Sequence, residues 1–438
     1  MTDSQLRIVA ALSLILITLS GVLLLWSPKD TARKDDETAL VWEVDEDAAT
    51  AISVDGPQGH LAFEKREGVW WMTDPFVERA ESWKVRDLLG KAGKAEHGRP
   101  IPGDAAKFGL GDPANGKIVL TIGGAPKTLR IGAAAPVKGQ AYVAAADGSV
   151  ALVAVDLAGL LALPVSDYRD HRVVSYATSN LTALVLAGPG GGLKARKDGA
   201  AWWIDTYPGA AVGDAVRGFA GLTPTATLRG DPMKVEEAAS FGLDLRYDAF
   251  VDVAAPPVAE PRLYYAATVL DLDAPQTIRV GEDWPQGARV DAGDGRGGYV
   301  YAEGVAPFGQ GPTDLAESAA FVAIPDTALA VKVALGGTAW EIHRDAADQP
   351  WSRGASVEPK GADALAVLSR AKFVYVPGVA PSLGAVWGTV EVLDGARSVI
   401  YEVGDLVGSQ RIVRDTRGGS PYPVDAAAID AIRTFWGP

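Results

Sequence analysis

The sequence predicts an α+β protein in which a single N-terminal transmembrane helix precedes two or three repeated β-rich modules. Three features support this prediction: an uncharged apolar segment near the N-terminus, short runs of alternating apolar and polar residues after it, and a Trp-Trp motif that recurs. Each alternating strand has one apolar face that must be buried. We therefore expect each module to contain antiparallel strands with one or two covering helices.

Composition limits the classes of function. The chain has 438 residues, 48% of them hydrophobic and 22% charged, which is typical of globular proteins. The formal net charge is −14, whereas a protein that binds nucleic acid needs a positive surface, so we expect no nucleic-acid partner. The chain contains no cysteine, which excludes disulfides, thiolate metal sites and a cysteine nucleophile.

Residues 8–26 form the predicted transmembrane helix, which is uncharged and about 28 Å long at 1.5 Å per residue. Pro28 would end the helix. The apolar run is longer than the core of a signal peptide and lacks a clear cleavage site, which favours an uncleaved anchor. The predicted anchor residues are Ile8, Leu12, Leu16, Leu19, Leu23 and Trp26.

The predicted topology places residues 1–7 in the cytoplasm, and residues 27–38 form a linker. Lys29, Arg33 and Lys34 follow the apolar segment, and a count of basic residues alone would place that side inside. Large downstream domains, however, cross the membrane largely regardless of charge. We therefore expect a single-pass protein of the inner membrane, with the bulk of the chain in the periplasm or otherwise outside the cytoplasm.

Beyond the linker, alternating runs at 39–43, 51–55, 60–65 and 69–73 predict strands, and apolar spacing predicts a helix over 83–96. Further strands are expected at 117–123, 128–132 and 141–145, and a second helix near 155–163. The order recurs, which predicts modules at 39–176, 177–327 and 328–438, the third shorter and divergent.

The repeats rest on short motifs. A Trp pair and a Phe-Gly-Leu motif recur at nearly the same offset, and a strand ending in glycine recurs at a longer one. In a strand, paired Trp side chains point to opposite faces, so one can enter the core while the other packs on a neighbouring element. We prefer this structural role to ligand stacking. The motif residues are Trp70, Trp71, Phe108, Gly109, Leu110, Gly132, Trp202, Trp203, Phe241, Gly242, Leu243 and Gly281.

The sequence shows no catalytic, cofactor or metal site. The four histidines are too far apart in sequence to form a helical metal pair, and no nucleophile elbow is present. A G-x-G-x-x-G match at 293–298 is followed by a strand, so we interpret it as a hairpin loop and not a dinucleotide loop. Acidic residues at 271, 273, 291 and 294 fail the calcium-loop spacing. We therefore expect no enzymatic activity and no cofactor.

These motifs resemble a known bacterial family. The Trp pair, F-G-L-x-x-P at 108–113, L-x-I-G at 129–132, Tyr142 and Tyr168-Arg169-Asp170 together are similar to the domain of unknown function 4340 family, best over residues 40–175. The resemblance implies an accessory protein found beside gliding-motility-type ABC transporter permeases. It implies no reaction and no catalytic residues.

Three functions follow as expectations. The first is a non-catalytic, membrane-anchored, extracytoplasmic accessory subunit of an ABC-transporter-type or other cell-envelope complex, acting through protein–protein contacts. The second is an envelope enzyme acting on glycan or peptide, whose acidic residues converge only in three dimensions. The third is a sensor domain for a small ligand or glycan, in which Trp side chains would stack on sugars.

Overall fold

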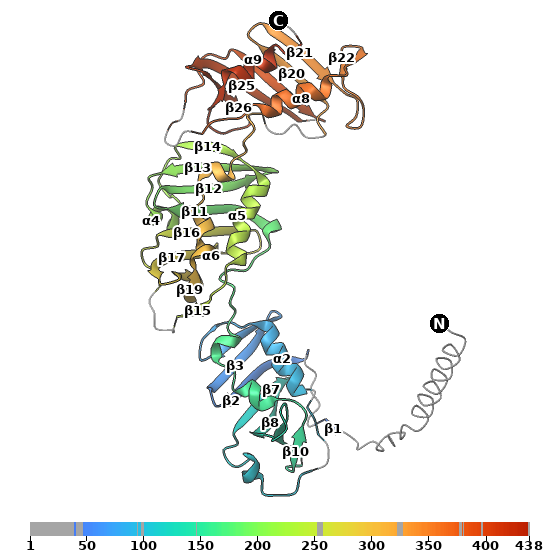
Figure 1. Ribbon diagram of the computed structural model, residues 1–438, viewed down its shortest axis with the longest axis vertical. Helices are drawn as coiled ribbons and strands as arrows, with labels where there is room; N and C mark the ends of the chain where they lie inside the picture. Colours follow the sequence, from blue (N-terminus) through green and yellow to red (C-terminus); the bar gives the residue numbers. More distant parts are fainter. Residues whose placement is uncertain are drawn as a thin grey trace, which may run out of the picture. The chain divides into compact units, whose positions relative to one another are not determined.

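The computed structural model in Figure 1 describes residues 39–40, 47–93, 95–97, 100–145, 147–251, 257–321, 327–375, 379, 381–395 and 397–436. The chain divides into two compact units, Met1–Asp170 and His171–Pro438. The predicted tail, anchor and linker over residues 1–38 lie outside the described residues.

The prediction of a single-pass inner-membrane protein is wrong on the described structure. Among the described residues, no helix is long and apolar enough to cross a membrane. The longest described helix, α5 (Pro232–Asp244), has 13 residues, whereas a spanning helix needs about 20 apolar ones. The predicted anchor residues, Ile8, Leu12, Leu16, Leu19, Leu23 and Trp26, lie outside the described residues.

The predicted α+β class is also wrong, because the described structure is mostly antiparallel β-sheet. The described residues form three sheets, with ten, nine and eight strands. The helices that accompany them are short: the first unit's largest is α2 (Ser82–Gly93). The alternating strands pair with close neighbours in sequence, and short helices cover the apolar faces of the sheets.

The first sheet lies in the first unit, and its strands are all antiparallel to their neighbours. Its spatial order is β1-β6-β10-β9-β8-β7-β2-β3-β4-β5. The elements are β1 (Ala39–Leu40), β2 (Ala49–Gly56), β3 (Gly59–Arg66), β4 (Val69–Asp74), β5 (Glu78–Arg79), α2, β6 (Glu96–His97), η1 (Ala105–Phe108), β7 (Gly116–Ile122), β8 (Ala125–Ala134), β9 (Ala141–Ala144), β10 (Val150–Val153), α3 (Leu157–Leu161) and η2 (Val165–Tyr168).

The second sheet has the order β14-β13-β12-β11-β16-β17-β18-β19-β15. Its elements are η3 (Thr178–Asn180), β11 (Leu181–Gly188), β12 (Gly191–Asp198), β13 (Ala201–Pro208), α4 (Val212–Val216), β14 (Ala226–Gly230), α5, β15 (Ala249–Phe250), β16 (Leu263–Val269), β17 (Gln276–Trp284), β18 (Gly287–Ala292), β19 (Gly297–Tyr301), α6 (Ala302–Val305), η4 (Ala306–Gly309) and α7 (Pro312–Leu315).

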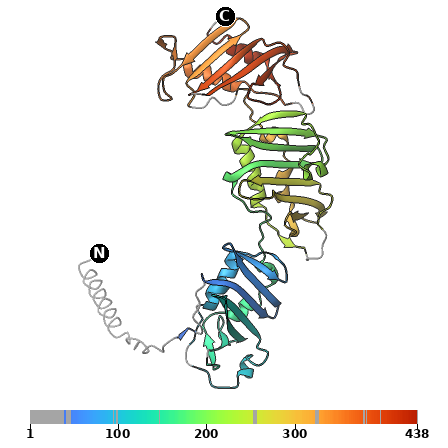
Figure 2. The same ribbon diagram turned by 180° about the vertical axis from the view of Figure 1, so that it is seen from behind.

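The third sheet has the order β23-β22-β21-β20-β24-β25-β26-β27 and belongs to the second unit. Its elements are β20 (Ala330–Leu335), β21 (Thr338–His343), β22 (Ser352–Arg353), β23 (Ser356–Val357), α8 (Gly361–Arg370), β24 (Gly388–Asp394), β25 (Arg397–Val407), β26 (Gln410–Asp415), β27 (Tyr422–Asp425) and α9 (Ala426–Arg433). Figure 2 shows the three sheets from behind.

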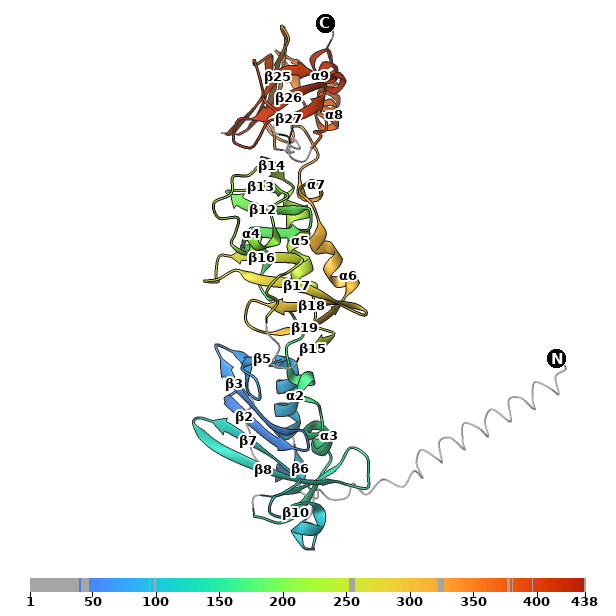
Figure 3. The same ribbon diagram turned by 90° about the vertical axis from the view of Figure 1, so that its left-hand side faces the viewer.

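The three sheets share one topology. In each, successive hairpins add strands to one side, a helix follows, and the chain returns as a meander whose first strand pairs with the first strand of those hairpins. Thus β7 pairs with β2, β16 with β11, and β24 with β20. The recurring helices are α2, α5 and α8, and Figure 3 shows the first two beside their sheets.

Each sheet buries its own core against its recurring helix. Val85, Leu88 and Leu89 of α2 lie in the first core, and Val235 and Ala238 of α5 lie in the second. The sheet of the third module is covered by α8 and α9, whose Leu368 and Ile429 are fully buried. A smaller core on the opposite face of the second sheet lies under α4.

Candidate functional site

The recurring Trp pairs occupy equivalent strands, β4 and β13. Trp70 and Trp202 are almost fully buried in the first and second cores. Trp71 points to the other face, where it is partly exposed and the Arg66 guanidinium lies 5.6 Å from its ring. The first member of each pair therefore packs a core, because alternate strand residues point to opposite faces.

Trp203 also lies on the face opposite the core, and yet only 4% of it is exposed. Gly419 packs on its ring: a Cβ at Gly419 would lie 2.9 Å from Trp203 Cζ3. Beside it, Ser420 N donates to Thr227 O at 2.7 Å, and Thr227 N donates to Ser420 Oγ at 2.9 Å. The loop before β27 therefore covers the free edge of β14 and joins the second and third sheets within the second unit.

The structure brings the Phe-Gly-Leu motif of the first unit onto Gly132. A Cβ on Gly132 would lie 2.2 Å from Phe108 O and 3.0 Å from Leu110 Cγ. Arg130 holds the same segment, because its Nη2 donates to Leu110 O at 2.6 Å. Phe108 in turn packs against Tyr142, with 4.8 Å between ring centroids. Three separate sequence motifs, Phe-Gly-Leu, L-x-I-G and Tyr142, therefore converge at one place beside β8.

The same contact recurs in the other two modules. Gly281 of β17 and Gly404 of β25 stand where Gly132 stands in β8, directly before a β-bulge in the pairing with the next strand. A Cβ on Gly281 would lie 3.0 Å from Val258, and one on Gly404 would lie 1.9 Å from Leu383 O. We call the segment between the recurring helix and the meander the connector. In all three modules, a buried apolar residue of the connector therefore packs against a bulge glycine.

This equivalence corrects one sequence pairing. Phe241, Gly242 and Leu243 lie in the last turns of α5, and Gly242 packs on Tyr265 and not on Gly281. The counterparts of Leu110 are therefore Val258 and Leu383, which sequence reasoning missed because they share no motif with Leu110. One sequence signal could have pointed to them: the bulge glycine, which follows a buried Ile or Val in each module.

We predict that Gly132→Ala destabilises the first unit by about 2 kcal/mol, because the new methyl group would overlap a backbone oxygen that cannot move alone. Thermal unfolding followed by circular dichroism measures the change. Gly111→Ala is the matched control, since its Cβ would meet only ordinary contacts of 3.7 Å or more. Equal melting temperatures for the two variants would contradict the packing role of Gly132.

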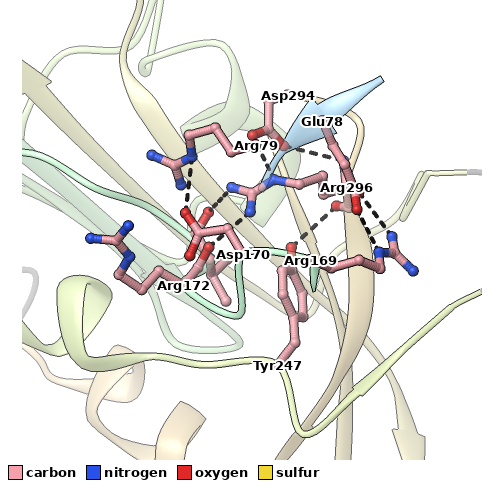
Figure 4. Close-up of polar contacts among 9 residues, drawn as sticks. Glu78, Arg79, Arg169, Asp170, Arg172, Tyr247, Asp294 and Arg296 are labelled. Carbon is pink, nitrogen blue, oxygen red and sulfur yellow. Dashed lines mark hydrogen bonds and ion pairs between the residues drawn. The ribbon is translucent and has the colours of Figure 1, made fainter. Parts of the chain in front are cut away.

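The Tyr-Arg-Asp motif lies at the end of the first unit and forms two ion pairs (Figure 4). Arg169 pairs with Glu78 through two bonds, Nε to Oε1 at 2.6 Å and Nη2 to Oε2 at 2.9 Å, and both side chains are over 90% buried. Asp170 pairs with Arg79 at 3.2 Å. The backbone runs antiparallel here, with a bridge between Ala80 and Arg169, so opposite charges alternate across two short segments.

A second buried arginine, Arg296, holds the start of the second unit (Figure 4). Its Nη1 and Nη2 each donate at 3.0 Å, to Arg172 O and Val173 O, and its Nε donates to Asp294 at 2.8 Å. Arg296 belongs to the G-x-G-x-x-G match, which forms the turn between the paired strands β18 and β19. The hairpin interpretation of that match is therefore confirmed.

The family match covers these motifs. Residues 70–261 match the family described as "Domain of unknown function (DUF4340)". The chain resembles this family, as its sequence motifs predicted. The matched range begins at Trp70 and includes both Trp pairs, the Phe-Gly-Leu contact and the Tyr-Arg-Asp ion pairs. No curated protein matches the chain.

Some solved structures are remotely similar. A DNA polymerase sliding clamp from Pseudomonas aeruginosa, solved with ligand, has a TM-score of 0.20 and 9% identity over 88% of this chain and 93% of that chain. A DnaN clamp of the same organism bound to griselimycin gives 0.17 and 9% over the same shares. DNA polymerase III subunit beta from Borrelia burgdorferi gives 0.15 and 7% over 89% and 94%. Scores this low support no argument about fold or function.

Titratable groups in the described structure serve structural bonds. Burial raises the pKa of Asp291, opposed by the N–H of Val258, which donates to its carboxylate at 2.5 Å. Burial also raises the pKa of Glu317, and Asp231 adds to that effect. Burial raises the pKa of Tyr176 to about 12; its hydroxyl donates to Ala239 O.

Metal-binding residues do not gather in the part of the chain that the structure describes. No group of three or more His, Cys, Asp or Glu side chains there could hold a metal ion. His60 bonds Asp55 at 2.6 Å between Nδ1 and Oδ1, and His171 Nδ1 bonds Tyr247 O at 2.7 Å. Asp271 accepts a hydrogen bond from Asn180. These polar groups fix local structure.

We predict that Arg169→Leu destabilises the first unit by about 3 kcal/mol, because it leaves Glu78 as an unpaired buried carboxylate. Adding Glu78→Leu should restore part of the loss, since both charges are then absent. Urea unfolding of the three proteins measures the free energies. The control is Arg66→Leu, whose pair with Glu64 is about half exposed and should contribute under 1 kcal/mol. A double variant less stable than Arg169→Leu would contradict the ion-pair account.

Proposed function

We propose that this protein is a non-catalytic subunit that works through protein–protein contacts of its β modules. The observation that carries the proposal is an apolar groove in the second unit. A functional surface of this kind is expected where several large apolar side chains stay exposed together. The family resemblance names a first class of partner to test: gliding-motility-type ABC transporter permeases.

The groove is built where the second and third sheets meet within the second unit, and we call it the valine groove. It encloses about 160 Å³. Val374, Val379 and Val407 line it and are 44%, 53% and 60% exposed. The remaining lining residues are Ala226, Leu228, Tyr375, Pro381, Gln410, Ile412, Pro421, Tyr422 and Pro423.

The chemistry of this lining favours an apolar segment of another protein. Aliphatic side chains and prolines surround the groove, and no charged residue is among the lining residues that the structure describes. Burying the three exposed valines would contribute free energy roughly in proportion to the apolar area removed from water. Buried apolar anchors of this kind commonly dominate binding between proteins.

The polar groups of the described structure support the non-catalytic part of the proposal. Glu78, Arg169, Asp170 and Arg296 are buried and bonded to neighbouring chain segments. Buried groups that are paired in this way hold chain segments together. An enzyme acting on glycan or peptide, the second candidate, gains no support from them.

A glycan-binding role would use the Trp pairs, and their burial weakens it. Trp70, Trp202 and Trp203 are all less than 5% exposed, so their rings cannot stack on a sugar. Trp71 is partly exposed and is covered by Arg66 on one face.

We predict that Val379→Asp combined with Val407→Asp abolishes partner binding, because each carboxylate would be desolvated in the complex. Tagged full-length protein would be crosslinked in its native cells, and co-purified proteins, ABC transporter permeases included, would be quantified by mass spectrometry. The double variant should recover any specific partner at least about tenfold less than the unaltered chain.

Val357→Asp is the matched control, because Val357 is 65% exposed on β23 but does not line the groove. All variants should show equal thermal stability. Two results would contradict the proposal: recovery of the same partners by the double variant and the control, or an unaltered chain that crosslinks to no other protein.

A further inference from the structure

One edge of the third sheet is only partly paired. β21 pairs with β20 along its whole length, but on its other side only His343 has a strand partner, Ser352 of β22. Among the described residues, no strand lies beside residues 338–342, which we call the free edge of β21. We propose that the free edge binds an extended segment of another protein as an added strand, in which basic and apolar residues alternate. This inference rests on the proposed function only in assuming contacts between proteins, and it names a second surface for them.

The second module shows that a strand belongs at this position. There β12 is the counterpart of β21, because each is the second strand of the first hairpin in its module. β12 pairs with β13 over the whole range Gly191–Asp198, and residues 204–208 of β13 lie where the free edge has no neighbour. In the third module the chain supplies only Ser352 and Arg353, which pair onwards with β23. Strand addition to an incomplete sheet is a common way of binding a peptide segment.

The turn between β20 and β21 determines which backbone groups point outwards. Gly336 and Gly337 have φ of 54° and 83°, as in the two-residue hairpin turn whose flanking residues form a hydrogen-bonded pair. Hydrogen-bonded and non-hydrogen-bonded pairs alternate along the strands. The N–H and C=O groups of Ala339 and Glu341 therefore point away from β20, and both residues are exposed. The next residue in this alternation, His343, does pair outwards, with β22.

The face of the free edge that lies away from the core is acidic. Glu341 is exposed on it, and Lys332, which lies opposite on β20, is 3.9 Å from Glu391 on its other side. Asp345 and Asp348, in the loop after β21, are exposed as well. Opposite charges on directly opposed residues of antiparallel strands stabilise the pairing. The segment that pairs here therefore carries Lys or Arg on this face.

The face toward the core is apolar. Trp340 and Ile342 are buried on it, and Trp436 packs against Trp340 with 4.7 Å between ring centroids. Trp436 is only partly buried, and the Arg353 guanidinium lies 5.1 Å from its ring. A basic residue of the added strand would be repelled by Arg353 on this side, whereas an aliphatic one would cover the exposed part of the Trp436 ring. The residues that alternate with the basic ones are therefore aliphatic.

A second copy of this chain does not fit the free edge. The antiparallel register that uses both outward residues of both copies pairs Ala339 with Glu341 of the other copy. That register places Gly337 of the other copy opposite His343, where Ser352 already pairs. We therefore expect the unaltered chain to sediment as a monomer in analytical ultracentrifugation. A dimer that Ala339→Pro dissociates would assign the edge to a second copy and overturn the inference.

The binding test uses the full-length protein and the peptide acetyl-Val-Lys-Val-Lys-Val, labelled with a dye at its C-terminus. Fluorescence anisotropy measures its affinity. We expect saturable binding, weakened at least about tenfold when both lysine nitrogens of the backbone carry a methyl group. The methylated peptide keeps its charge and side chains but loses the N–H donors that face the free edge, so it separates strand pairing from attraction to an acidic protein.

Two variants at one position test the location. Ala339→Pro removes an outward N–H group without removing a hydrogen bond to β20, as proline does on edge strands. It should weaken binding of the lysine peptide about fivefold or more. Ala339→Val is the matched control, because it keeps the N–H group and suits a strand. Its affinity should equal that of the unaltered chain, and both variants should unfold at the same temperature.

Charge reversal tests the specificity. Glu341→Lys should weaken the lysine peptide about threefold and strengthen the same peptide with Glu in place of Lys. Glu236→Lys, an equal change of charge at an exposed position on α5, should alter neither affinity. The double variant Val379→Asp and Val407→Asp should also bind the lysine peptide normally, so a failure at the valine groove is distinguishable from a failure here.

Four results would overturn the inference. They are the absence of saturable binding of the lysine peptide, equal affinities for the plain and methylated peptides, undiminished binding by Ala339→Pro, and loss of binding in the valine-groove double variant.

Discussion

The contact between a bulge glycine and the connector that crosses over it is the constraint on which each module depends. The connector after the recurring helix must return to the sheet and begin the meander. Where it crosses the second strand of that meander, Leu110, Val258 or Leu383 is buried against Gly132, Gly281 or Gly404. A Cβ on Gly132 or Gly404 would overlap a backbone oxygen of the connector, so only glycine allows that approach, whereas a Cβ on Gly281 would press on the Val258 side chain. The bulge that follows bends the strand at the same place.

Charge is used differently at the ends of the modules. Pairs such as Glu78 with Arg169 lie where little water reaches, and removing one partner would leave an isolated buried charge. Arg296 is also buried, and it donates hydrogen bonds to two backbone oxygens at the start of the second unit. These charges hold segments that secondary structure alone would leave loose. The valine groove, in contrast, is lined by uncharged residues among those that the structure describes.

Sequence reasoning located most of the elements of the first module. The expected helix over 83–96 is α2, the helix expected near 155–163 contains α3, and the strands around the Trp pairs are β4 and β13. Alternation and helical spacing report local burial, which is why they succeed. Trp203 shows the limit of such reasoning. Its burial depends on a loop more than 200 residues later in the sequence, and no local pattern of residues 201–208 indicates that loop.

The errors have two physical origins. The Phe-Gly-Leu match at 241–243 had the right spacing, but its residues continue a helix, and spacing alone cannot distinguish a turn from a helix end. The α+β class gave too much weight to helices that prove short beside sheets of up to ten strands. The ion pairs around Glu78 could not be predicted, because their partners come from distant segments.

Hydrogen exchange at the three crossings tests the central claim most directly. Beside the first crossing, Asn115 N donates to Gly109 O at 2.8 Å within the connector; beside the second, Arg262 N donates to Val280 O at 2.7 Å; at the third, Asp405 N donates to Leu383 O at 3.0 Å. If the crossing holds each module together, these amides exchange as slowly as those in the central strands of their own sheets. Exchange at the rate of an exposed loop, while the central strands stay protected, would contradict the account.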